Sequence, residues 1–232
     1  MHYFGGKSRC GKRIAEFINQ FLTNEKDYIE PFIGGAWVTQ YIWNGCKSKT
    51  AYDINPYLIE CYKSLLEGKL FPRTLSKEEY LTIKQNKEFD PALTGFVGFG
   101  CSFAGKWFGG FASSGSRNYC LNAYNSIMKK KSKLNRVLFL CDDYLNLTPV
   151  DSVIYCDPPY ANTTKYDYCP NFNSVKFWET MRIWSKNNIL IISEYNSPED
   201  FKCVAEFKTK TDIRNSNNSK ELRIEKLFMI KK

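Results

Sequence analysis

The residues best suited to chemistry are Asp157, Pro158, Pro159 and Tyr160, which come shortly after the apolar, β-prone run 152–155. That run predicts a strand, and Asp157 then falls at the carboxyl edge of a sheet, where open α/β folds bind ligands. The prolines remove backbone donors and leave a carbonyl to accept a hydrogen bond. A carboxylate and a carbonyl together can bind both N–H groups of an exocyclic nucleobase amine, and Tyr160 offers a ring for stacking. The alternative is an ordinary turn.

A second pattern places glycines and an acidic residue after two expected strands. The run 28–32 predicts a short strand, and the glycine pair 34–35 lets the backbone pass close to a ligand before a helix expected over 36–43. The run 49–52 predicts another strand that ends at Asp53. Asp53 follows the glycines by about 20 residues, the spacing at which an acidic residue reaches ribose hydroxyls in Rossmann-like folds.

Four segments, in order along the chain, resemble the Dam-type, D12 class DNA adenine-N6 methyltransferase family. They are Tyr3-Phe4-Gly5-Gly6-Lys7, Tyr28-Ile29-Glu30-Pro31-Phe32-Ile33-Gly34-Gly35, Asp53-Ile54-Asn55-Pro56-Tyr57-Leu58-Ile59, and Asp157-Pro158-Pro159-Tyr160 with its continuation to Tyr166. The likeness covers residues 1–60 and 137 to about 195 well, and the middle only loosely. It implies transfer of a methyl group from S-adenosylmethionine to the N6 amine of adenine in double-stranded DNA, with the base flipped out of the duplex.

The resemblance also implies roles for single residues. Asp157, Pro158, Pro159 and Tyr160 are expected to be catalytic. The expected cofactor-binding residues are Tyr3, Gly6, Lys7, Glu30, Pro31, Phe32, Gly34, Gly35, Asp53, Ile54, Asp143, Tyr144 and Asp157. Lys7 is expected to meet the methionine carboxylate of the cofactor, and Asp143 and Tyr144 its adenine.

The middle of the chain differs in charge and composition. Residues 61–136 carry 13 basic and 5 acidic side chains, whereas the flanking parts are nearly balanced, so a polyanion is the natural partner of this region. Residues 95–115 contain seven of the 14 glycines among many aromatics, which predicts an irregular segment. By analogy with the family, it is expected to recognise the DNA target. The candidates for DNA contact are Lys106, Trp107, Arg117, Asn118, Tyr119, Lys129 and Lys130.

The alternating pattern of the remaining segments predicts the fold. Strands are expected over 137–141, 153–155 and 188–193, a helix over 175–185, and a closing antiparallel pair near the end of the chain. We therefore expect an α/β, Rossmann-like, three-layer methyltransferase fold. Residues 1–60 and 137–232 are expected to form its catalytic domain, and 61–136 an inserted helical or irregular target-recognition subdomain.

Composition excludes several classes of protein. The 232 residues are 43% hydrophobic, which argues against disorder, and no run of about 18 apolar residues predicts a membrane span. The nine cysteines are scattered and the chain has one histidine, so we expect free thiols and no metal site. We expect a cytoplasmic protein that is a monomer or a weak dimer.

Other functions remain open at this stage. A cytosine-N4 DNA methyltransferase uses the same exocyclic chemistry, although that group more often has Ser at the position of Asp157. A structured RNA is a conceivable substrate. The chain could also be a catalytically silent relative that binds DNA, although intact Asp157, Asp53 and Lys7 argue against this.

Overall fold

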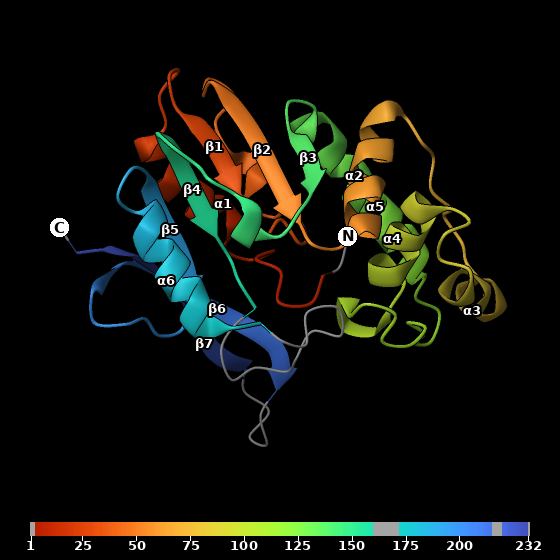
Figure 1. Ribbon diagram of the computed structural model, residues 1–232. Coiled ribbons are helices and arrows are strands. Elements are labelled where there is room, and N and C mark those ends of the chain that lie inside the picture. Colours follow the sequence, from red (N-terminus) through yellow and green to blue (C-terminus); the bar gives the residue numbers. More distant parts are fainter. Residues whose placement is uncertain (1–2, 160–171, 215–219, 232) are drawn as a thin grey trace.

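A computed structural model describes residues 3–159, 172–214 and 220–231, whose arrangement is shown in Figure 1. At its centre is a seven-stranded sheet with the order β3-β2-β1-β4-β5-β7-β6. The strands are β1 (Asp27–Glu30), β2 (Ser48–Asp53), β3 (Leu138–Cys141), β4 (Ser152–Cys156), β5 (Ile189–Glu194), β6 (Phe201–Arg214) and β7 (Lys220–Ile230). β1 to β5 are parallel, and β7 pairs antiparallel with β5 and β6. The expected Rossmann-like methyltransferase fold is therefore confirmed.

Helices pack on both faces of the sheet. α1 (Gly11–Ile18) shares a buried cluster with Tyr155 of β4, and α6 (Ser174–Trp184) shares another with Ile154. Since neighbouring residues of a strand point to opposite faces, both faces of β4 are covered, and all its residues are buried. This gives the expected three layers and holds the end of β4 rigidly.

α2 (Pro56–Glu67) begins where the sequence predicts. The Asn55 side chain accepts a hydrogen bond from the backbone N–H of Leu58 at 3.1 Å, and Pro56 occupies the first turn. The helix ends at Gly68, whose φ of +101° suits a residue without a Cβ. These local signals fix how the chain leaves the end of β2.

The helix expected over 36–43 does not form, and this prediction was wrong. Gly34 and Ala36 have φ angles of +43° and +51°, outside the helical region. The N–H of Ala36 instead bonds back to the carbonyl of Ile33 at 2.8 Å, which closes a tight turn. Only the short 3-10 helix η2 (Thr39–Tyr41) follows.

The middle of the chain is more regular than its glycines suggest. It holds α3 (Lys77–Gln85), α4 (Pro91–Gly100) and α5 (Tyr119–Leu134), which lie with α2 to one side of the sheet (Figure 1). α4 corrects the prediction of an irregular segment from Gly95 onward. A Cβ on Gly95 would lie 2.0 Å from the carbonyl oxygen of Tyr57, so the glycine lets α4 pack closely on α2. Beyond α4, the short helix η3 (Phe103–Gly105) and loops follow.

A single buried cluster connects this region to the sheet. It runs from Ala51 of β2 and Phe139 of β3 to Phe96 of α4 and Ile127 of α5. The expected domain division stays a prediction, and its boundary at residue 60 falls inside α2. Across the described ranges, no helix has both the length and the apolar character needed to cross a membrane.

Candidate active site

Acidic side chains gather where the parallel strands end. Glu30 ends β1, Asp53 ends β2, Asp157 follows β4 and Glu194 ends β5. These strands are neighbours and run in the same direction, so the four residues share one edge of the sheet. This is the edge at which open α/β sheets bind ligands.

Asp157 is held by a cation from the amino-terminal segment. The Nζ atom of Lys7 lies 2.6 Å from Oδ1 of Asp157 and 3.5 Å from Oε1 of Glu225 on β7. The side chains of Lys7, Glu225 and Asp157 are 7%, 13% and 19% exposed. Burial lowers the pKa of Lys7, but the two carboxylates outweigh it and the net shift is upward. Lys7 is therefore a charged partner of Asp157, and Glu225 is a site residue that the sequence did not suggest.

The residues that follow Asp157 are described only in part. Pro158 is buried and Pro159 is half-buried. Tyr160 and the continuation to Tyr166, which the sequence places in the site, lie outside the described residues. The structure thus places three of the four expected catalytic residues at the end of β4.

The glycine turn is tied to the end of β2. Oδ2 of Asp53 accepts a hydrogen bond from the N–H of Gly34 at 3.1 Å, and Oδ1 accepts one from the N–H of Asn55 at 3.0 Å. The ring of Tyr3 covers Gly34, where a Cβ would lie 2.8 Å from the ring. Burial raises the pKa of Asp53 to about 6, against the effect of these hydrogen bonds. The expected cofactor residues of β1, β2 and the amino terminus therefore meet in one place.

Glu30, at the end of β1, is buried next to this turn. It is 2% exposed, and its Oε2 accepts hydrogen bonds from the hydroxyl of Tyr28 at 2.5 Å and from the hydroxyl of Thr39. Burial raises the pKa of Glu30 to about 8, although both hydroxyls oppose the shift. Pro31, which follows it, is also buried. Glu30 therefore anchors the turn to η2, a contact that the sequence did not predict.

Four further residues expected to bind the cofactor differ in their surroundings. Ile54 is 45% exposed beside the buried Asp53. Asp143 caps the short helix η4 (Tyr144–Asn146) by accepting a hydrogen bond from the N–H of Leu145 at 3.0 Å. Tyr144 is buried, with its ring centroid 5.2 Å from that of Phe32. Tyr144 and Phe32 thus pack in the core under α6. The apolar side chain exposed among these residues is that of Ile54.

The candidates for DNA contact differ in their exposure and in the contacts that they make. Arg117 and Lys129 are exposed, and Lys106 lies with its Nζ 4.8 Å from the ring centroid of Phe4. Asn118 caps α5 by accepting a hydrogen bond from the N–H of Leu121 at 2.8 Å. The remaining two are aromatic. Tyr119 lies 5.2 Å below the guanidinium of Arg117, and Trp107 stacks on Tyr57 with centroids 5.5 Å apart.

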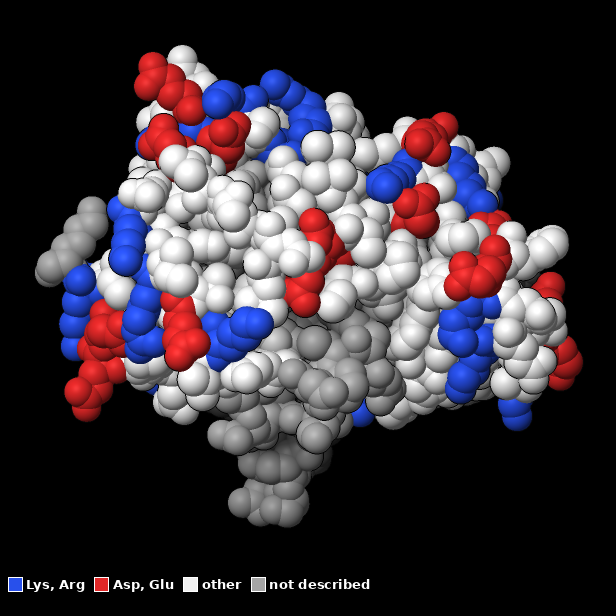
Figure 2. Space-filling view, in the orientation of Figure 1, with Lys and Arg blue, Asp and Glu red and all other residues white. Residues whose placement is uncertain are grey.

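Lys130 was predicted wrongly as a DNA contact. It is 1% exposed, and its Nζ donates a hydrogen bond to the carbonyl of Gly35. A side chain buried in this way cannot reach a phosphate. On the face seen in Figure 2, Lys and Arg lie in small groups among Asp and Glu, so the basic excess of the middle region does not form one band there.

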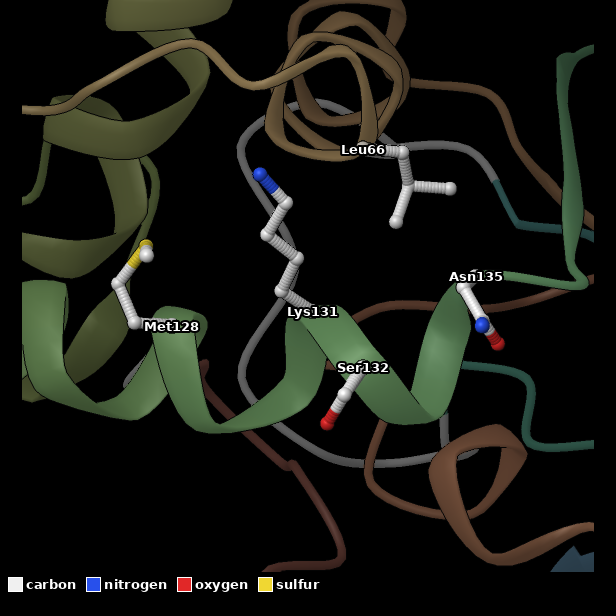
Figure 3. A pocket seen from close by; sticks show the side chains of 5 residues that line it. All are labelled: Leu66, Met128, Lys131, Ser132 and Asn135. Carbon is white, nitrogen blue, oxygen red and sulfur yellow. The ribbon is translucent and has the colours of Figure 1, made fainter.

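A hollow of about 440 Å³ lies away from these residues, between α2 and α5. Its lining residues are Leu66, Met128, Lys131, Ser132 and Asn135. Figure 3 shows Lys131 extending from α5 toward α2, where Leu66 faces it. None of the five is a candidate site residue, so this hollow is not the candidate active site.

Within the described part of the chain, potential metal ligands and cysteines form no further candidate site. No group of three His, Cys, Asp or Glu side chains there is placed to hold a metal ion. The eight cysteines within it are free, and burial raises the pKa of the Cys156 thiol well above its usual range.

Comparisons with known proteins found relatives in sequence and matches among solved structures. The DNA adenine methylases of two strains of Vibrio cholerae serotype O1 are 31% identical to it over 174 residues, which make up 64% of this chain and 61% of each relative. The chain thus spans less than two thirds of the length of these curated relatives. Among solved structures, an rRNA methylase from Streptococcus thermophilus covers 94% of both chains with a TM-score of 0.41 and 8% identity. The 23S rRNA methyltransferase ErmE covers 97% of this chain and 69% of its own, with a TM-score of 0.41 and 11% identity.

A match to a family profile agrees with the motifs. Residues 3–92 match the sequence profile of the D12 class N6 adenine-specific DNA methyltransferases, a range that contains the Tyr3–Lys7, Tyr28–Gly35 and Asp53–Ile59 segments. The resemblance of this chain to the D12 class of N6 adenine-specific DNA methyltransferases is therefore confirmed.

Proposed function

We propose that this chain is an S-adenosylmethionine-dependent methyltransferase that modifies the N6 amine of adenine in duplex DNA. The observation that carries the proposal is the position of Asp157. It lies at the end of β4, paired with Lys7, at the same sheet edge as Asp53 and the glycine turn. The profile match over residues 3–92 supports the same reaction class.

The residues of this edge suit the methyl donor. The Asp53 carboxylate is an acceptor that can bind ribose hydroxyls, and the exposed Ile54 beside it offers an apolar face to an adenine. The adjoining turn is formed by Gly34 and Gly35; Tyr3 packs against it, and Gly6 lies against Trp37, which also contacts Gly35. S-adenosylmethionine supplies an electrophilic methyl group on a sulfonium. Lys7 already faces two carboxylates of the chain, which favours a role toward Asp157 over the expected contact with the methionine carboxylate.

Asp157 and Pro158 would activate the amine by hydrogen bonding. The lone pair of the adenine amine is delocalised into the ring, so the nitrogen is a poor nucleophile. Two acceptors, the Asp157 carboxylate and the Pro158 carbonyl, bias it toward a pyramidal geometry with the lone pair facing the methyl group. The N–C bond would form as the C–S bond of the donor breaks, S-adenosylhomocysteine would be the leaving group, and the methylated nitrogen would lose its extra proton to solvent. The ammonium of Lys7, 2.6 Å from the carboxylate, would orient Asp157 for this step.

Duplex DNA is proposed as the substrate from the family resemblance, and the adenine amine must then reach Asp157, whose side chain is only 19% exposed. A stacked base cannot do so, and flipping it costs a few kcal/mol. Tyr160 would offset about 1 to 3 kcal/mol of that cost by stacking. Arg117 and Lys129 are exposed for phosphate contacts.

The test uses genomic DNA and labelled S-adenosylmethionine, followed by sequencing that maps the modified bases. We expect N6-methyladenine at a defined sequence and no transfer by Asp157→Ala. Modified cytosine would replace the proposal by the N4 reaction. Near-normal turnover by Asp157→Ala, or no transfer by the unmodified chain, would end it.

A second pair of variants tests the role of Tyr160. Tyr160→Ala should lose more rate than Tyr160→Phe, because the ring and not the hydroxyl is proposed to hold the base. Equal losses in the two variants would contradict this role.

A further inference from the structure

Lys130 of α5 is buried where a lysine is unusual. Its neighbours on the inner face of the helix are Ala123, Ile127 and Leu134, each with 0% exposure, and Lys130 itself is 1% exposed. Burying an amine is costly unless it is hydrogen-bonded, so an aliphatic side chain would fill this position more cheaply. The lysine must therefore serve a contact that an aliphatic residue cannot make.

That contact is with the glycine turn. The Nζ atom of Lys130 donates a hydrogen bond to the carbonyl of Gly35 and lies 3.4 Å from the centroid of the Trp37 ring. Burial lowers the pKa of Lys130 well below its usual range, although the nearby Glu30 opposes this and Lys133 adds to it. The hydrogen bond needs only an N–H, which the side chain has in either protonation state.

Trp37 extends the contact to the amino-terminal segment. A Cβ on Gly35 would lie 2.7 Å from Cδ1 of Trp37, and a Cβ on Gly6 would lie 2.9 Å from the same atom. Both glycines therefore lie directly against the indole that Lys130 covers. Gly6 precedes Lys7, which pairs with Asp157. A continuous set of contacts thus joins α5 to the end of β4.

We propose that Lys130 is a positioning residue that holds the turn of Gly34 and Gly35 in the shape that receives the methyl donor. This rests on the proposed function, because it assumes that the turn binds S-adenosylmethionine. The hydrogen bond leaves α5 for a carbonyl 95 residues earlier in the chain and so ties the middle region to the turn. Without it, the turn would still be bound to Asp53 but would lose its support on the side of Gly35.

The experiment measures the dissociation constant of S-adenosylmethionine by titration calorimetry without DNA, together with KM, kcat and the melting temperature. Lys130→Met removes the N–H while keeping the length of the side chain. Lys131→Met is the matched control, because Lys131 is the next residue of the same helix and points into the hollow between α2 and α5 (Figure 3). Trp37→Phe independently tests the contact between the Trp37 indole and the glycine turn.

We expect Lys130→Met to bind the donor about tenfold more weakly, the effect of losing one hydrogen bond at the upper end of its usual range. KM should rise by the same factor, kcat at saturating donor should stay within about twofold, and Lys131→Met should match the wild type. A role in packing alone would change the melting temperature and leave the dissociation constant of the folded protein unaltered. That result overturns the proposal.

Two further outcomes separate the alternatives. Should Lys130→Met not fold, Trp37→Phe decides, since wild-type affinity in that variant also overturns the proposal. A wild type that binds no S-adenosylmethionine refutes the proposed function and this inference with it. If the wild type binds the donor and Lys130→Met binds it equally tightly, only the inference about Lys130 is refuted.

Discussion

Asp157 and Glu30 lie at the ends of neighbouring parallel strands, yet their carboxyl groups are held differently. Asp157 keeps 19% of its side chain exposed and pairs with the cation of Lys7. Glu30 is 2% exposed and accepts hydrogen bonds from two hydroxyls. An ion pair favours the charged form of a carboxyl group, whereas burial favours the neutral form. The same residue chemistry at the same edge is therefore held in two ways, and we propose a reactive role for Asp157 and an architectural one for Glu30.

The comparison predicts where function and stability separate. Changes in the ion-paired group, formed by Lys7, Asp157 and Glu225, should act mainly on the rate of methyl transfer. Changes in the sealed group, formed by Glu30 with its donors Tyr28 and Thr39, should act mainly on the free energy of unfolding and its dependence on pH. A variant of the sealed group that abolishes transfer without destabilising the fold would break the comparison.

The largest effect is expected from Asp157→Asn. The amide keeps the shape of the side chain but loses the negative charge, so it binds the amine less well and no longer attracts Lys7. We expect kcat to fall by about 10²- to 10³-fold, the usual cost of losing one electrostatic contact to a transition state. Single-turnover transfer to DNA measures this, with circular dichroism as the check on folding. A loss below about threefold would assign Asp157 to the structure and not to the reaction.

A smaller effect on rate is expected from Lys7→Met. The variant removes the cation that both Asp157 and Glu225 contact, so Asp157 is less well oriented. We expect kcat to fall by about tenfold or more, less than in Asp157→Asn because the carboxylate itself remains. Glu225→Gln should lower kcat less than Lys7→Met, since Glu225 lies 3.5 Å from Lys7 whereas Asp157 lies at 2.6 Å. A greater loss in Glu225→Gln than in Lys7→Met would contradict this order.

Local signals explain what the sequence predicts correctly. Asn55 and Pro56 mark the start of α2, and the apolar run 152–155 marks β4, because caps and buried strands depend on residues close together in the chain. The position of Asp157 at the end of β4 follows from the same signals. Glu225, the second carboxylate that Lys7 contacts, could not be predicted in this way, because β7 brings it to a residue 218 positions earlier in the chain.

The wrong predictions have equally specific causes. The helix expected over 36–43 is prevented by the left-handed turn at Gly34 and Ala36, which serves the contact with Asp53. Lys130 was grouped with its neighbours as a basic run. The spacing of Ile127, Lys130 and Leu134 is that of one helix face, and this signal indicates burial. The glycines of α4 suggested a loop because their role, close packing on α2, lies outside the segment.

The sealed group gives a prediction about pH. The pKa of Glu30 is raised to about 8 in the folded protein, so below that pH the folded state holds a proton that the unfolded state releases above about 4.5. The contribution of Glu30 to stability should therefore be fully present below about pH 4.5 and decline as pH rises toward 8, by up to about 1.4 kcal/mol per pH unit. The charge of Asp157 also raises the pKa of Glu30, whereas the charge of Lys130 lowers it.

Glu30→Gln keeps the shape and cannot ionise, so it should flatten this slope. Urea unfolding of both proteins at pH 5 to 8 measures the effect. Parallel slopes would mean that Glu30 is already ionised in the folded state.

The smallest effect is expected from Thr39→Val, which removes one hydroxyl donor to Glu30 at nearly constant volume. Hydrogen bonds to a charged acceptor are worth more than those to a neutral one, about 1.5 to 3 against about 1 kcal/mol. At pH 6, where Glu30 is neutral, the variant should therefore lose about 1 kcal/mol of unfolding free energy. At pH 9, above the pKa of about 8, the loss should roughly double because the remaining Tyr28 hydroxyl must then bind the carboxylate alone. A loss that is equal at both pH values would show that Glu30 does not titrate between them, and the contrast with Asp157 would then rest on exposure alone.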